Sequence, residues 1–118
     1  MAIGRDAILA ADDLPREEVP VDEWGKGETV IVRAITASDF DRFQLDLVSY
    51  RDNPQQVENM RCRFLVFCLI DEGGQRLFAD NEAALLGRKN PMPILRLYRK
   101  AQELSGLGPQ AIEDAAKN

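Results

Sequence analysis

The hydrophobic pattern changes along the chain, from short β-branched runs in the N-terminal third to helical spacing in the rest. Two segments have strand character, Glu17–Val21 and Thr29–Ile35. Residues Trp24 to Gly27 connect them, and glycine tolerates the positive φ angles of tight turns. Because Pro20 cannot donate a backbone hydrogen bond, the first segment is predicted as an edge strand. The pattern predicts a β-hairpin, which needs helices packed on one face since an isolated hairpin is marginal.

A helix is predicted directly after the second strand. Thr36 or Ser38 can serve as its N-cap, and Asp39 follows in the first turn, where the helix dipole favours an acid. Its apolar positions recur at the spacing of a helix face, at Phe40, Phe43, Leu47 and Val48.

A further helix is predicted from Asn53-Pro54, a cap followed by proline at the first helical position. Its apolar stripe comprises Val57, Met60, Phe64 and Cys68. Within it, the run Phe64–Ile70 is apolar on all sides, which is typical of a buried helix. A buried strand is the competing interpretation, because periodicity does not distinguish the two over so short a run.

The remaining segments are separated by glycine and proline. Short helical turns are predicted at residues 5–11 and end before Pro15; a turn at 71–74 precedes an extended piece at 76–78. Asp80 is predicted to cap a brief helix over 81–86 that ends at Gly87. An amphipathic helix then starts near Pro91 and Pro93 and stops at Gly106, with Ile94, Leu97, Tyr98, Ala101 and Leu104 as its stripe. Gly108-Pro109 is predicted to start a last short helix.

Together these elements predict the fold class. A chain of 118 residues with 45% hydrophobic and 30% charged residues has the composition of one globular domain, here residues 1–118. We expect an α+β fold that is predominantly α-helical, with the N-terminal β-hairpin packed on a bundle of about four to five helices.

The net charge of −5 is unevenly distributed. Residues 1–31 hold eight acids and three bases, whereas residues 32–118 hold twelve of each. Within the second part, a stretch without acids carries five cations: Arg88, Lys89, Arg96, Arg99 and Lys100. The chain therefore has an acidic head and a basic patch, and its overall acidity argues against sequence-independent binding of nucleic acid.

The residue inventory does not favour catalysis. The chain has no histidine, the usual base for an activated nucleophile, and no phosphate-binding loop motif. Cys62 and Cys68 lack metal-ligand spacing and are expected as buried, reduced thiols. No run approaches the ~18 apolar residues of a membrane span. We expect no catalytic residues, no metal and no cofactor, no contact with a membrane, and a cytoplasmic location.

Five residues are candidates for binding a partner protein: Trp24, Arg96, Tyr98, Arg99 and Lys100. Tryptophan is enriched at binding hot spots, although Trp24 also suits an anchor between the hairpin and the core. The other four share one helix, whose basic face suits an acidic partner such as the head of another copy. The alternatives are that this face pairs with the head of the same chain or stays solvated.

Several short motifs, in their order and spacing, resemble one protein family. They are Arg5 to Val19, Glu23-Trp24-Gly25, Val30 to Arg33 with Thr36, Leu69 to Phe78, Leu86-Gly87 and Ala101 to Leu107. This pattern is similar to the tail assembly chaperones of long-tailed, siphovirus-type bacteriophages, and it covers nearly the whole chain. None of the motifs is catalytic.

The resemblance implies a protein that acts in the cytoplasm of the infected host and is absent from the virion. Such chaperones coat the long, helical tape measure protein and help to recruit tail tube subunits around it, so the implied partners are the tape measure protein, the tail tube protein and further copies forming a homo-oligomer. The family often makes a longer product by ribosomal frameshifting. We therefore expect a slippery sequence in the codons for Lys117-Asn118.

Two other functions fit the same residues. One is a structural head–tail connector or tail completion protein that stays in the virion. The other is a small cytosolic adaptor unrelated to phage.

Overall fold

The structure is a computed structural model that describes residues 1–49 and 58–108. Five α-helices, two 3-10 helices (η) and three strands lie in these ranges. In chain order they are α1 (Arg5–Ala10), β1 (Arg16–Pro20), η1 (Asp22–Trp24), β2 (Thr29–Arg33), α2 (Ala37–Ser49), α3 (Met60–Leu65), β3 (Leu69–Ile70), η3 (Asp80–Glu82), α4 (Ala83–Leu86) and α5 (Pro91–Leu104). The predicted α+β class is confirmed.

The expected hairpin forms one side of a three-stranded antiparallel sheet in the order β1-β2-β3. β1 pairs with β2 along its whole length, from Arg16 opposite Arg33 to Pro20 opposite Thr29. Pro20 therefore closes an edge strand, as predicted. Between the strands the chain forms η1 and a turn in which Gly27 has a φ of 78°. The short β3 pairs with the other side of β2, with Ile31 opposite Ile70.

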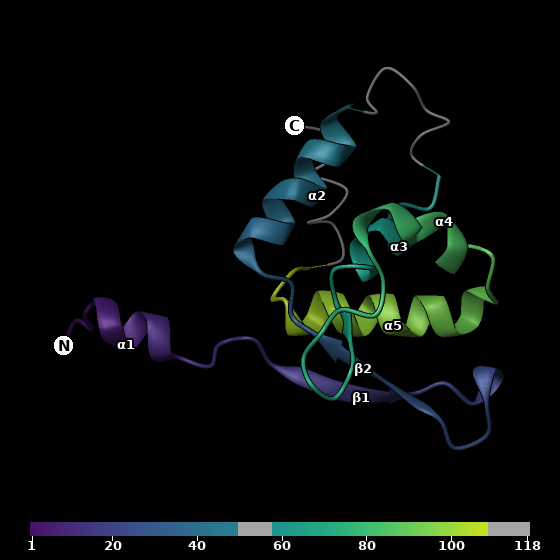
Figure 1. Cartoon of the computed structure of the whole chain (residues 1–118), viewed down its shortest axis with the longest axis horizontal. Coiled ribbons are helices and arrows are strands. Elements are labelled where there is room, and N and C mark those ends of the chain that lie inside the picture. Colours follow the sequence, from purple (N-terminus) through teal and green to yellow (C-terminus); the bar gives the residue numbers. More distant parts are fainter. Residues whose placement is uncertain (50–57, 109–118) are drawn as a thin grey trace.

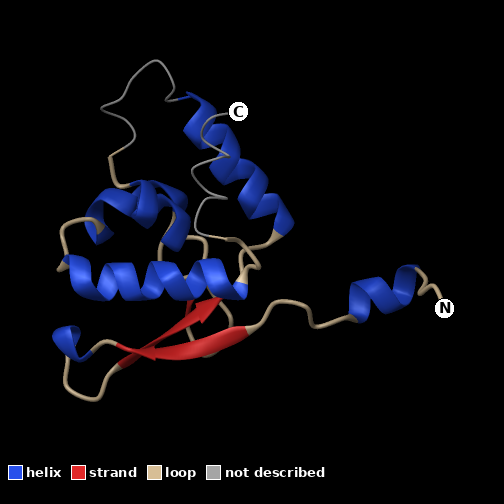
Figure 2. Ribbon diagram, turned by 180° about the vertical axis from the view of Figure 1, so that it is seen from behind, coloured by secondary structure: helices blue, strands red, loops and turns tan. Residues whose placement is uncertain are grey.

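Helix α5 forms the middle layer of the molecule (Figures 1 and 2). The sheet packs against one side of α5 and α3 against the other, and α4 lies on the same side as α3 and packs on it. Four of the five residues of the predicted stripe are buried, and Leu104 is half-buried against the core. Because α5 is covered on both sides, Pro93 and Gln102 are buried as well. Val32 from β2 and Phe64 from α3 are fully buried in the same core.

The termini of α5 match the predicted start and stop signals. At the start, the Asn90 side chain accepts a hydrogen bond of 2.9 Å from the Met92 amide, and Pro91 occupies the first turn. At the end, Gly106 adopts a φ of 71°, and the Leu107 amide donates to the Gln102 carbonyl at 2.9 Å. Together with the bond of 3.1 Å from the Gly106 amide to the Glu103 carbonyl, this bond forms a Schellman motif, which favours glycine because a Cβ is strained at positive φ.

Segment 64–70 is divided between the two predicted conformations. The helical expectation holds as far as Leu65, where α3 ends, and the strand alternative holds for β3. A tight turn joins them, because the Cys68 amide donates to the Leu65 carbonyl at 2.8 Å. All seven residues are buried, which explains why hydrophobicity alone did not locate the break.

Two local predictions are wrong. Val48 was placed on the buried face of α2, but it is 39% exposed while Phe43 and Leu47 are buried. Asp80 was predicted as a helix cap; instead Glu82 accepts a hydrogen bond of 2.6 Å from the Ala79 amide. The Asp80 carboxylate pairs with Arg76 at 2.7 Å and with Arg42.

The remaining predictions differ in outcome. The predicted extended piece at 76–78 is present only at Arg76, which bridges to Ile70, because residues 77 and 78 form bends. The brief helix that ends before Gly87 is present as η3 and α4. The predicted helical turns at residues 5–11 correspond to α1, which projects away from the sheet (Figure 1). The helix start at Asn53-Pro54 and the helix after Gly108 lie outside the described residues.

Candidate functional site

Arg96 of α5 reaches the connection between β1 and β2. Its guanidinium donates to both carboxylate oxygens of Glu23, at 2.9 and 2.7 Å, and to the Pro20 carbonyl at 3.0 Å. This hydrogen bonding lowers the pKa of Glu23 from 4.5 to about 2. The planar guanidinium suits such two-pronged binding of a carboxylate. Arg96 thus holds the end of the hairpin against α5.

Lys100 makes the corresponding contact one helical turn later. Its Nζ atom lies 2.6 Å from a carboxylate oxygen of Glu17 on β1 and 3.1 Å from one of Glu103. The hydrogen bond to Glu17 raises the pKa of Lys100. Residues four apart share a helix face, so Arg96 and Lys100 both point toward the sheet. For these two cations, the structure shows pairing with the acidic head of the same chain.

Tyr98 and Arg99 lie on different sides of α5. The Tyr98 side chain is buried and packs edge-on against Phe64, with ring centroids 5.9 Å apart. The Arg99 side chain is exposed and makes no ion pair within residues 1–49 and 58–108. Of the three predicted cations on α5, Arg99 is therefore the one without an ion-pair partner among the described residues.

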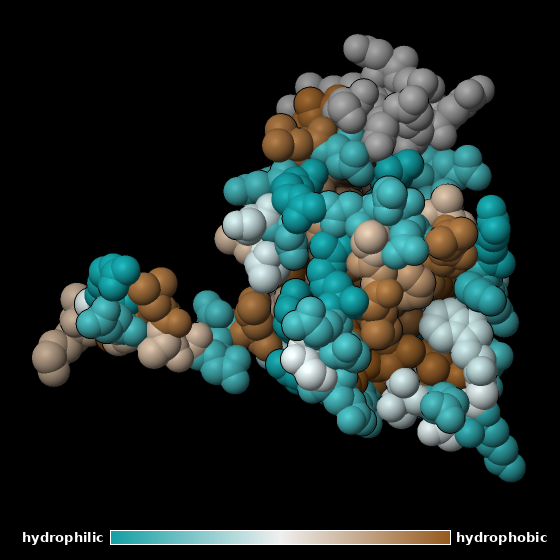
Figure 3. All heavy atoms as spheres, in the orientation of Figure 1, coloured by the Kyte–Doolittle hydropathy of each residue, from teal (hydrophilic) through white to brown (hydrophobic). Residues whose placement is uncertain are grey.

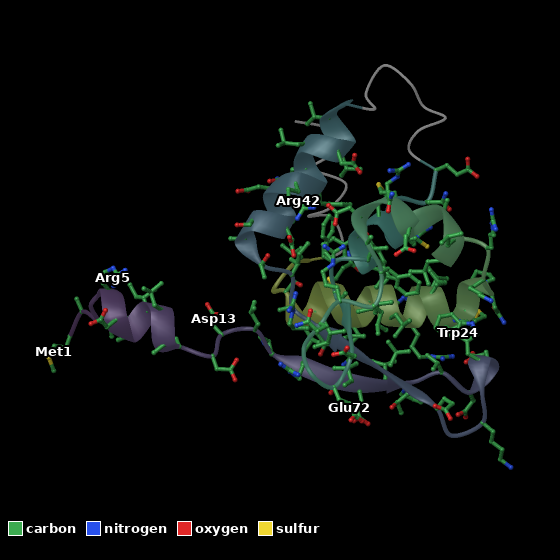
Figure 4. The ribbon with its side chains drawn as sticks, in the orientation of Figure 1. Met1, Arg5, Asp13, Trp24, Arg42 and Glu72 are labelled. Carbon is green, nitrogen blue, oxygen red and sulfur yellow. The ribbon has the colours of Figure 1, made fainter. Side chains whose placement is uncertain are left out.

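Trp24 is half-buried at the end of η1 and packs against the core. Figure 4 shows it between the hairpin connection and α5. Its indole nitrogen is buried and has no hydrogen-bond partner among the described residues. This contact with the core corresponds to the second role considered for Trp24 from the sequence, an anchor between the hairpin and the core.

A groove that the sequence did not predict lies between α3 and the start of α5. We call it the α3–α5 groove; its volume is about 410 Å³, and residues Met60, Arg61, Cys62, Lys89, Ile94 and Leu95 line it. Arg61 and Lys89 are exposed, so they present positive charge beside apolar side chains. Figure 3 shows apolar side chains on the face that carries α4 and α5, and again on α1. Only packing brings Arg61 and Lys89 together, because they belong to different sequence segments.

The two thiols are poorly suited to nucleophilic chemistry. Burial raises the pKa of Cys62, and it raises the pKa of Cys68 to about 12. Since the thiolate is the reactive form, both side chains are held in the unreactive state near neutral pH.

The described residues form neither a metal-binding cluster nor a membrane-spanning helix. Residues 1–49 and 58–108 contain no cluster of three His, Cys, Asp or Glu side chains arranged to hold a metal ion. No helix in these same ranges has the length and hydropathy required to cross a membrane.

Comparisons with known proteins agree on one family. A family model described as phage tail assembly chaperone matches residues 4–118. Among solved structures, the chain is similar to the tail assembly chaperone of bacteriophage HK97, with a TM-score of 0.60 and 20% identity over 84% of this chain and 90% of that one. At this identity the structural likeness shows a shared fold. No curated protein matches the chain.

Proposed function

Because this chain belongs to the phage tail assembly chaperone family, we propose that it coats the tape measure protein during phage tail assembly and helps to recruit tail tube subunits. The observation that carries the proposal is the family match, which covers residues 4–118. We further propose that this binding takes place in the host cytoplasm and involves no catalysis.

The surface of the protein suits a binding role. Large apolar side chains that no described residue covers include Leu45 at 70% exposed and Met92 at 61%. A long apolar client such as a tape measure protein needs contacts of this kind to stay soluble. Modest contacts, repeated along the client, would allow tube subunits to displace the chaperone later.

We place part of the client surface on α5, around Arg99. The five predicted residues remain candidates, but Arg96 and Lys100 are already ion-paired and Tyr98 is buried. An exposed arginine without a partner in the described part of the chain can pair with a carboxylate of a client at little desolvation cost.

Co-expression with the tape measure protein tests this function. We expect the tape measure protein to move from the insoluble to the soluble fraction when this chain is present. Arg99→Glu should reduce that soluble fraction, whereas Lys26→Glu, a matched charge reversal at the exposed hairpin turn, should leave it unchanged. An insoluble tape measure protein in the presence of the unmodified chain would contradict the proposal.

Mass spectrometry of purified virions separates the chaperone from the alternative of a structural connector or completion protein. A chaperone is absent from mature particles, whereas a structural subunit is present. If the chain were a cytosolic adaptor unrelated to phage, it would not change the solubility of the tape measure protein.

A further inference from the structure

Residues 1–13 form an N-terminal arm that packs on no described part of its own chain. All six residues of α1 are exposed, including Ile8 at 58% and Leu9 at 68%, and Ile3 before it is 67% exposed. Figure 4 shows Met1, Arg5 and Asp13 along this arm, away from the sheet. A helix of six residues is too short to be stable by itself in water. The arm therefore needs a surface that covers Ile8 and Leu9.

The α3–α5 groove has the properties of such a surface. Its volume of about 410 Å³ lies in the range of pockets that enclose a few side chains. Ile94 and Leu95 contribute apolar walls, while Arg61 and Lys89 contribute positive charge, and none of the described residues that line it is an acid. Arg88, also exposed, lies next to Lys89 in the chain.

The arm is complementary to the groove in both hydrophobicity and charge. It carries three acids, Asp6, Asp12 and Asp13, and a single basic side chain, Arg5, which pairs with Asp6 at 3.1 Å. Asp12 and Asp13 follow α1 directly and have no ion-pair partner in the described residues. A docked arm can thus bury Ile8 and Leu9 in the groove while Asp12 and Asp13 meet Arg61 and Lys89.

We propose that the N-terminal arm of one copy docks in the α3–α5 groove of a second copy. In Figure 1 the arm leaves the sheet on one side, whereas α4 and the start of α5 lie on the other. A contact between two different surfaces is heterologous, and it extends into an open chain of copies when the rotation between them does not close a ring.

The purpose of this contact rests on the proposed function. A protein that coats a rod benefits from contacts between neighbouring copies. The proposed contact differs from the charge pairing expected from the sequence. The cations Arg96 and Lys100 are occupied within the chain, so the contact between copies uses Arg61 and Lys89 instead.

Sedimentation velocity of the full-length chain over a range of concentrations tests the contact without any client. We expect the unmodified chain to form dimers and larger species, and high salt to weaken them by screening. Ile8→Asp with Leu9→Asp disables the arm, and Arg61→Glu with Lys89→Glu disables the groove. Each double variant should weaken self-association by about tenfold or more. All four positions are exposed, so the variants should stay close to the melting temperature of the unmodified chain. Among the described residues, the contact that Arg61→Glu removes is that of the guanidinium with the Tyr98 ring, 5.9 Å from its centroid.

Mixing the two variants provides the decisive measurement. The arm variant keeps an intact groove and the groove variant keeps an intact arm, so a mixture should form one-to-one dimers that do not grow. The proposal is overturned if the unmodified chain stays monomeric, if either variant associates like the unmodified chain, or if the mixture forms no dimer. Because the tape measure protein is absent, failure here is distinct from failure of the co-expression experiment.

Discussion

At the scale of single residues, the ion pairs between α5 and the sheet determine which charges remain available to partners. Arg96 and Lys100 bind Glu23 and Glu17, although the members of the first pair lie 73 positions apart in the chain. The charged groups that remain unpaired among the described residues include Arg99, Lys89 and Asp13. Charge counts along the sequence do not separate these two groups, because pairing depends on which side chains packing brings together.

The pair between Glu23 and Arg96 should make stability depend on pH in the acidic range. The pKa of Glu23 is lowered from 4.5 to about 2, so the pair contributes fully above pH 4.5 and its contribution is lost as the pH falls toward 2. We expect Glu23→Gln to lower the melting temperature slightly at pH 7, since exposed pairs contribute little. The difference from the unmodified chain should disappear near pH 2.

Glu72→Gln is the matched control for this measurement, because Glu72 is exposed and no ion pair involves it in the described part of the chain. Its melting temperature should follow that of the unmodified chain throughout. A Glu23→Gln effect that persists undiminished at pH 2 would show that the carboxylate charge is not its cause.

At the scale of elements, the ends of α5 follow from local signals, whereas the break within segment 64–70 does not. Asn90, Pro91 and Gly106 delimit α5 by local hydrogen bonds and backbone angles, which depend on near neighbours. The break after Leu65 depends instead on β2, whose free edge β3 pairs with. The sequence of 64–70 is compatible with helix and strand, and the neighbouring strand selects the conformation.

The start of α2 offers a stability test at this scale. The sequence left Thr36 and Ser38 open as caps, and in the structure the Thr36 hydroxyl accepts a hydrogen bond of 3.1 Å from the Asp39 amide. Thr36→Ala should therefore reduce the free energy of unfolding by about 1 kcal/mol. Ser38→Ala, at an exposed position in the first turn, should change it by less than about 0.5 kcal/mol. Urea denaturation measures both, and equal losses would contradict the assignment of the cap.

At the scale of the whole molecule, α5 organises the fold by packing against the sheet on one side and against α3 on the other, where α4 packs on α3. The arm lies outside this arrangement, and the Cα radius of gyration of 15.2 Å exceeds the value of about 13 Å typical of a compact chain of 100 residues. The same chain thus combines a packed body with a projecting segment that is free to meet another surface.

Hydrogen exchange should distinguish the packed body from the projecting arm. In dilute solution the amides of α1 should exchange almost as fast as in an unfolded chain, because they are exposed and the helix is short. Amides of α5 and of segment 64–70 should be protected nearly to the level of global unfolding. Protection of α1 should rise with protein concentration if the arm docks in a second copy, whereas rapid exchange at every concentration would contradict docking.

By itself the sequence determined the edge strand with Pro20, the start and stop of α5, and the family, because each depends on residue types at fixed local spacing. Tertiary structure decided the division of 64–70, the exposure of Val48 and the partners of Arg96. It also created the α3–α5 groove. The physical reason is that these features depend on contacts between distant segments, which form only when the layers pack around α5.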